Sequence, residues 1–371
     1  MTGGSVVSRD PARDVVLVIG SGASYGARPR AAPHLRPPMG NALAAYLLRW
    51  FDANAPRDND PLWGNSMGNP RDFGAPSKSL YRSSPKFDDP DLRPILVRAV
   101  ERSVTSSTAF EDVMNELLRE ETRRSLDKVN DVICYSFLCG RECAFPEEED
   151  LYDQLFSGLR ASLRAVITPN YDLLVEEALE RVGLTYRCRG IAEAGDADVV
   201  IDKFHGSVDW FLPSGSGVGS TPEIARRAGR PLEAVRQTRV LSYSNAFGVH
   251  AASGHRRWNA VSEHKLGHGS PVLVTYGPGK DTLYGRPHLE RVRQECAADL
   301  QESPPKKIIS LGISPPRGGG DDDAWEKLCQ VFHSLPSAKE YWTRIPEHHQ
   351  QMAAYGFEPR LGYFDELLAA L

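Results

Sequence analysis

Polar segments that follow three apolar runs of the chain have residue types suited to holding a phosphate and moving a proton. Closely spaced glycines let a ligand approach bare backbone N–H groups, while amide, carboxylate and imidazole side chains orient and deprotonate reacting groups. Each segment stands where a buried parallel strand is expected to end. The three pairs of run and segment are Val15–Ile19 with Gly20-Ser21-Gly22-Ala23-Ser24, Ala165–Thr168 with Thr168-Pro169-Asn170-Tyr171-Asp172, and Val199–Phe204 with His205-Gly206-Ser207.

The first segment is a glycine turn directly after a strand. Gly20 and Gly22 permit a tight turn whose amides reach a phosphate, and the start of the next helix would reinforce the binding. A plain strand-to-helix turn explains this pair of glycines about as well. The acidic residue that dehydrogenases carry about 20 positions further on is not found at a second strand end, which disfavours hydride transfer.

Asn170, Asp172 and His205 are the candidate catalytic residues. Either Asn170 or Asp172 is also explained as a cap of the helix expected at Leu173–Val182, and a lone histidine is more often structural than catalytic. A polar run at the carboxyl end of one strand and a histidine at the end of another nevertheless predict a shared crevice, where open parallel sheets bind ligands.

Alternating strands and helices predict an α/β fold with a doubly wound, parallel, Rossmann-like sheet interrupted by a helical insertion. The first part of the nucleotide-binding domain is expected at 1–52, a loop and helical insertion at 53–163, the remainder of the domain at 164–334, and a tail with a terminal helix at 335–371. Further strands are predicted at Thr185–Cys188, Val272–Tyr276 and Lys307–Leu311.

Composition excludes several classes of protein. The 371 residues include 44 basic and 49 acidic side chains, a net charge of −5, so direct nucleic-acid binding is not expected. No apolar run is long enough to span a membrane and no signal peptide is visible, which favours a soluble, cytoplasmic protein. Cys134, Cys139 and Cys143 lack the paired spacing of a zinc ribbon and fit a helix, so no metal site is predicted.

The order of these motifs resembles the sirtuin family, whose NAD-binding signature is a Gly-Ala-Gly-x-Ser turn, Thr-Gln-Asn-x-Asp, His-Gly and a late Gly-x-Ser. The late motif stands here as Gly312-Ile313-Ser314. Pro169 replaces the family's glutamine, and the zinc ribbon that helps to form the acyl-lysine groove of protein deacylases is absent. The chain therefore looks more like the bacterial sirtuin-like effectors of antiphage defence, which hydrolyse NAD+ and deplete the infected cell.

The resemblance implies a role for each matching residue. Asn170 would orient the nicotinamide ribose and an attacking water, Asp172 would hold the carboxamide or ribose, and His205 would remove a proton from water or from a ribose hydroxyl. The pyrophosphate and the adenosine ribose of NAD+ would be bound by the two glycine motifs. The residues expected to do so are Gly20, Gly22, Ala23 and Ser24 at the pyrophosphate and Gly312 and Ser314 at the ribose.

Control of the activity is expected to come from outside this domain, because the chain has no recognisable sensor domain and constant NAD+ hydrolysis would harm the cell. Self-assembly into a homo-oligomer or a partner would supply it; the family's partners include HerA-type ATPases, which we place first, and short Argonaute proteins. Three other functions stay open at this point. They are an NAD-dependent protein deacylase, a non-enzymatic sensor that binds NAD or ADP-ribose, and a purely structural subunit with a vestigial pocket, although the intact set of Asn170, Asp172 and His205 argues against the last.

Overall fold

The computed structural model describes two large parts of the chain and several shorter ones. Of the helix predicted at Gly40–Asp52 only positions 43 and 47 are described, and both are helical. The loop predicted at Ala53–Pro94, apart from position 94, and most of the helical insertion, with Cys134, Cys139 and Cys143, lie outside the described residues. The described residues are 13–27, 150–191, 197–213, 241–242, 269–273, 286–316 and 322–371, together with the single positions 43, 47, 94, 97, 98, 101, 102, 133 and 137.

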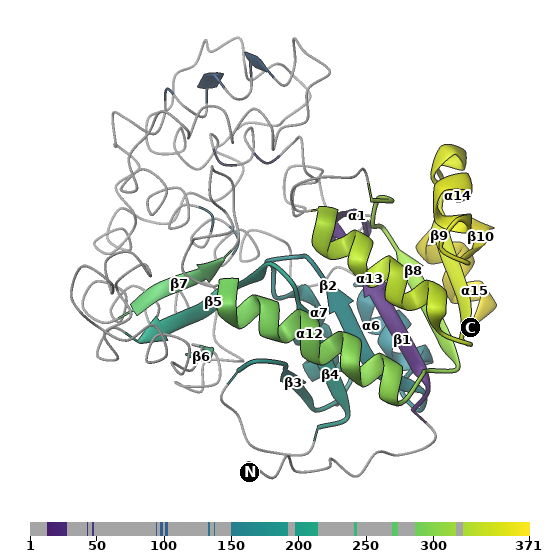
Figure 1. Ribbon diagram of the computed structural model, residues 1–371, viewed down its shortest axis with the longest axis horizontal. Coiled ribbons are helices and arrows are strands. Elements are labelled where there is room, and N and C mark those ends of the chain that lie inside the picture. Colours follow the sequence, from purple (N-terminus) through teal and green to yellow (C-terminus); the bar gives the residue numbers. More distant parts are fainter. Residues whose placement is uncertain are drawn as a thin grey trace.

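A parallel sheet forms the centre of the described structure (Figure 1). Seven strands stand in the order β10-β9-β8-β1-β2-β4-β3, and each neighbouring pair is parallel. This confirms the predicted α/β, Rossmann-like fold. The strands are β1 (Val15–Ile19), β2 (Leu163–Thr168), β3 (Tyr186–Cys188), β4 (Val199–Lys203), β8 (Lys307–Leu311), β9 (Ala338–Thr343) and β10 (Glu358–Leu361).

Helices cover both faces of the sheet because its central strands are apolar on both sides. All five residues of β1 are buried, with Val16 and Val18 packed toward α12 and α13 and Leu17 toward α6 and α7. The layers are therefore helix, sheet and helix (Figure 1). The helices named here are α6 (Leu151–Gly158), α7 (Leu174–Arg181), α12 (Arg286–Glu302) and α13 (Asp322–Ser334).

One predicted strand belongs to a different sheet. The run Val272–Tyr276 is predicted to lie in the doubly wound sheet. Its positions 274–276 lie outside the described residues, and Val272 and Leu273 belong to β7 (Gly269–Leu273), which pairs antiparallel with β5 (Gly206–Pro213). With β6 (Leu241–Ser242) they make a three-stranded sheet. That assignment was wrong because β5 leaves the parallel sheet through a tight turn at Gly206, whose φ of 80° suits glycine, and offers β7 a new edge.

The C-terminal tail contributes more than its predicted terminal helix. β9 and β10 extend the parallel sheet beyond β8, with α14 (Pro346–Ala353) packed on them. The terminal helix is α15 (Phe364–Ala370), and it packs against α6. The tail is thus part of the sheet and its cover (Figure 1).

The direction in which strands are added reverses beside β1. From β1 the chain adds β2, β3 and β4 on one side, whereas β8, β9 and β10 follow on the other. In open α/β sheets, ligands bind outside the carboxyl ends of the strands at such a switch point. The residues that follow β1 and β8 therefore stand where this kind of fold binds ligands.

The imidazole of His288, in the first turns of α12, gives the fold a measurable acid sensitivity. Burial and the nearby charge of Arg291 lower the pKa of His288 to about 4. Between the ordinary histidine pKa of about 6.5 and this value the unfolded chain binds more protons than the folded chain, so the free energy of unfolding should fall as the pH falls through that window.

Urea denaturation at pH 7 and pH 4.5 tests this for the natural protein and His288→Gln. The natural protein should lose more stability than the variant over this interval, because only it carries the buried titratable ring. Equal losses in the two proteins would contradict the assignment.

Candidate functional site

The sequence motifs meet at one edge of the sheet. β8, β1, β2 and β4 are consecutive neighbours in the sheet and run parallel. Each of the four predicted motifs begins at the last residue of one of these strands or within two residues after it. They follow Leu311 of β8, Ile19 of β1, Thr168 of β2 and Lys203 of β4.

The glycine motifs pack against each other at the switch point. The Gly22 N–H donates a hydrogen bond of 2.9 Å to the Gly312 carbonyl. A Cβ at Gly20 would lie 2.3 Å from the Gly312 oxygen, and one at Gly312, whose φ is 65°, would lie 2.1 Å from the Ala23 nitrogen. Glycine is required at these positions by the close approach of two backbone turns, independently of any ligand.

Two backbone amides that were expected to bind the diphosphate are already hydrogen-bonded within the protein. The Gly22 amide is paired with Gly312 and the Ala23 amide with the Gly20 carbonyl at 3.0 Å. A diphosphate bound through the Gly22 amide would have to replace the Gly312 carbonyl. Ser314, also expected at the nucleotide, has an exposed side chain, and its carbonyl accepts a 3.0 Å hydrogen bond from Trp325 Nε1.

Ser24 joins the glycine turn to the next motif. It lies in the short helix α1 (Ser21–Gly26), and both Ala23 and Ser24 are fully buried. Ser24 Oγ accepts a hydrogen bond of 2.9 Å from Asn170 Nδ2. Ser24, expected to bind the pyrophosphate, therefore holds the amide of a candidate catalytic residue.

Asn170 is fixed at both its backbone and its side chain. Its N–H donates to Thr168 Oγ1 at 3.0 Å, and its side chain, 7 % exposed, donates to Ser24. Since an amide group is planar, fixing Nδ2 also sets the direction of Oδ1. Asn170 thus presents one oriented acceptor at the carboxyl end of β2.

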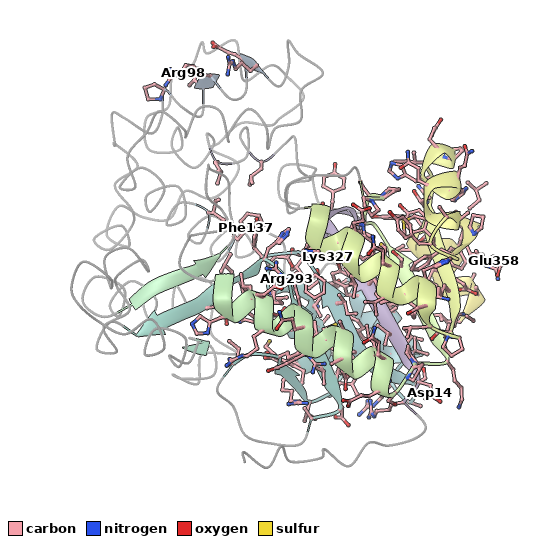
Figure 2. All side chains as sticks on the ribbon, viewed as in Figure 1. Asp14, Arg98, Phe137, Arg293, Lys327 and Glu358 are labelled. Atoms are coloured by element: carbon pink, nitrogen blue, oxygen red, sulfur yellow. The ribbon has the colours of Figure 1, made fainter. Side chains whose placement is uncertain are left out.

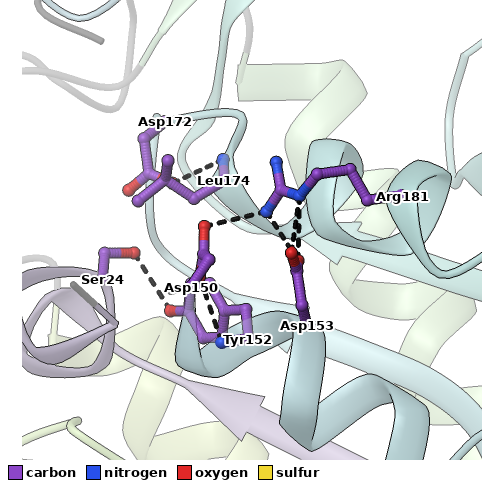
Figure 3. A network of polar contacts seen from close by, with 7 residues as sticks. All are labelled: Ser24, Asp150, Tyr152, Asp153, Asp172, Leu174 and Arg181. Atoms are coloured by element: carbon purple, nitrogen blue, oxygen red, sulfur yellow. Dashed lines mark hydrogen bonds and ion pairs between the residues drawn. The ribbon is translucent and has the colours of Figure 1, made fainter. Parts of the chain in front are cut away.

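Asp172 stands one residue before Leu173, the N-cap of the helix that follows. Its Oδ1 accepts a 3.0 Å hydrogen bond from the Leu174 N–H, so the carboxylate pairs one free backbone N–H at the start of α7, as the capping alternative expected, but from one residue before the cap. The carboxylate is 8 % exposed and lies in the same region as Ser24 (Figure 3). This hydrogen bond uses one carboxylate oxygen and leaves the group's negative charge at the edge of the sheet.

His205 stands in the tight turn between β4 and β5. Its ring is half-buried, and its centroid lies 6.1 Å from that of Tyr171 in the Asn170–Asp172 segment. Phe137 packs on Tyr171 edge to face at 6.5 Å, and Arg293 of α12 donates to the Phe204 carbonyl at 3.5 Å. Phe137 and Arg293 are labelled in Figure 2. Asn170, Asp172 and His205 are therefore brought to one region.

A buried lysine links two of these segments. Lys203, fully buried at the end of β4, donates hydrogen bonds to the Asp172 carbonyl at 2.5 Å, Glu176 Oε1 at 2.7 Å and Ser207 Oγ at 3.0 Å. Burial alone would lower the pKa of Lys203, but Glu176, Asp209 and Asp172 outweigh it and raise the pKa, so the ammonium stays charged. One cation thereby ties the Asn170–Asp172 segment to the turn that carries His205.

Sequence reasoning missed Lys203 and also Tyr152, whose hydroxyl contacts Ser24. A charged residue at a strand end is usually exposed, and its burial depends on partners far along the chain. The run Val199–Val200–Ile201–Asp202–Lys203 did contain a signal for Lys203, because two consecutive charged residues complete an otherwise apolar strand. Tyr152 belongs to the insertion, where no motif was found.

Comparison with models of known protein families found no match, and no curated protein matches the chain. Within the described residues, no group of three or more histidine, cysteine or acidic side chains is arranged to hold a metal ion. Nor does any helix of the described part have the length and apolar character that crossing a membrane requires. The site is therefore interpreted from its own geometry.

The glycine contact predicts a specific loss of stability. Gly312→Ala adds both left-handed strain and a clash with Ala23, and should lower the free energy of unfolding by about 2–6 kcal/mol. Gly356→Ala is the matched control, since its φ is 80° but the nearest atom to a new Cβ is 3.5 Å away. Urea denaturation should show the smaller loss for the control, and equal losses would contradict the close approach.

The Lys203 ammonium predicts a second effect on stability. Lys203→Met leaves Glu176 buried without its cation and should lower the free energy of unfolding by about 3–5 kcal/mol. The double variant Lys203→Met/Glu176→Leu removes both charges and should recover most of that loss. Chemical denaturation measures both, and a single variant as stable as the natural protein would refute the buried ion pair.

Proposed function

We propose that the protein is a sirtuin-like NAD+ glycohydrolase, which cleaves NAD+ to nicotinamide and ADP-ribose. The observation that carries the proposal is the hydrogen bond between Asn170 and Ser24, because it joins two motifs that resemble an NAD-binding signature at neighbouring strand ends beside the switch point. His205 lies against the same segment through Tyr171. A topological switch point, an oriented amide and an imidazole at one sheet edge support glycoside cleavage.

The chemistry needs little from the protein beyond position and charge. Nicotinamide in NAD+ is positively charged, so breaking the C1′–N bond releases it as a neutral molecule and leaves an oxocarbenium-like ribose. Asn170 orients the ribose and the water, and the Asp172 carboxylate favours the developing positive charge. Water adds its oxygen to C1′ and its proton passes to His205.

The same proposal includes a cellular role as an antiphage-defence effector that depletes NAD+. Because the free activity would harm its own cell, it is held off until a homo-oligomer assembles or a partner binds. A HerA-type ATPase is the first partner to test and a short Argonaute protein the second. This part of the proposal rests on the motif resemblance.

Release of nicotinamide from NAD+ tests the activity, with the purified protein measured alone and with each candidate partner. His205→Ala should lower turnover by about 10²–10⁴-fold, because a general base is removed. Asn170→Ala should abolish turnover. His333→Ala, an exposed histidine at the end of α13, is the matched control and should keep full activity.

Other results would assign another function. NAD+ consumption only in the presence of an acylated peptide would identify a deacylase. NAD+ or ADP-ribose binding that persists in His205→Ala, with no release under any of these conditions, would identify a sensor. Full activity in folded Asn170→Ala and His205→Ala variants would remove both residues from the mechanism.

A further inference from the structure

Tyr152, on α6, contacts the candidate site through its hydroxyl group, which lies against Ser24. Its ring is fully buried, stacks on Phe156 with centroids 5.7 Å apart and meets Phe364 of α15 edge to face at 5.6 Å. Packing on both sides leaves the ring few alternative positions. The hydroxyl is therefore held at a fixed place beneath the sheet edge.

That hydroxyl shares a hydrogen bond of 3.1 Å with Ser24 Oγ, as Figure 3 shows. Ser24 Oγ accepts at 2.9 Å from Asn170 Nδ2, so three polar groups from α6, α1 and the end of β2 form a chain. Ser24 is fully buried, so its hydroxyl is not in contact with bulk solvent. A serine hydroxyl rotates, and its direction is set by the partners it has.

We propose that Tyr152 is a positioning residue for the reaction, which acts by fixing the Ser24 hydroxyl and through it the amide of Asn170. The inference rests on the proposed function and adds to it a residue outside the sequence motifs. Without the Tyr152 hydroxyl, Ser24 keeps its place in α1 but loses one of the two partners that orient its oxygen. Asn170 then occupies the productive orientation for a smaller fraction of the time.

The electrostatics of this group agree with such a role. Burial, with a further contribution from the Asp172 carboxylate, raises the pKa of Tyr152 well above its usual value. The hydroxyl therefore stays protonated at neutral pH and serves as a neutral hydrogen-bonding group. It does not compete with His205 for the proton of water.

The packing also explains why this position is stable. Phe364 and Tyr363 belong to the C-terminal end of the chain, and a Cβ at Gly26 would lie 2.5 Å from the Tyr363 ring. The end of the chain thus supports α6 and α1 together, the two helices that carry Tyr152 and Ser24.

Tyr152→Phe removes the hydroxyl and keeps the ring, so it separates positioning from packing. We expect kcat for nicotinamide release to fall roughly 3- to 10-fold, the equivalent of one neutral hydrogen bond, with KM nearly unchanged. Tyr186→Phe is the matched control. Tyr186 is the first residue of β3, at the amino end of that strand, and its hydroxyl donates a hydrogen bond of 2.9 Å to Glu180. The control should leave kcat unchanged.

A double-variant cycle tests the route through Ser24. If Tyr152 acts only through that serine, Tyr152→Phe should have no further effect on kcat in a Ser24→Ala background. Additive losses in kcat, or an unchanged kcat in a folded Tyr152→Phe protein, would overturn the proposal.

A measurement that needs no activity keeps this inference distinct from the proposed function. The side-chain amide signals of Asn170, identified by their loss in Asn170→Asp, should shift and exchange faster with solvent in Tyr152→Phe than in Tyr186→Phe. If the natural protein releases no nicotinamide, the proposed function fails and these signals alone decide the positioning role. Unchanged Asn170 signals would overturn it.

Discussion

The close contact between the turns after β1 and β8 determines where the rest of the candidate site lies. The two halves of the sheet meet there, and the Gly22–Gly312 hydrogen bond holds α1 directly against the end of β8. Ser24 is carried by α1, so its hydroxyl reaches the end of β2 and holds Asn170. Because each step depends on the one before, a displaced α1 would also displace the amide.

A second connection fixes the other half of the site. The Lys203 ammonium binds the Asp172 carbonyl on one side and Ser207 on the other, and these residues flank Asn170 and His205 along the chain. Glu176 neutralises the cation within the interior. The candidate residues are thus positioned by buried polar contacts that a ligand does not have to supply, and such preorganisation is what catalysis by orientation and charge requires.

The fold could be predicted where burial alone defines a strand. Val15–Ile19 and Lys307–Leu311 are apolar, β-branched runs, and both are strands with those bounds. β9 and β10 were missed because they lie toward an edge of the sheet and carry charged residues, with a proline in β10. β7 was placed in the wrong sheet, since an apolar run does not specify its partner strand.

The location of the candidate site could be predicted from the sequence, but the contacts within it could not. The order of the motifs predicted that Asn170, Asp172 and His205 lie at one edge of the sheet. The pairing of Ser24 with Asn170 depends on the position of α1, which no local sequence pattern encodes. The most direct test of the account is a crystal structure of His205→Ala soaked with NAD+. We expect the nicotinamide ribose beside Asn170 and the diphosphate near the turn that follows β1. A nucleotide bound away from this edge of the sheet would contradict it.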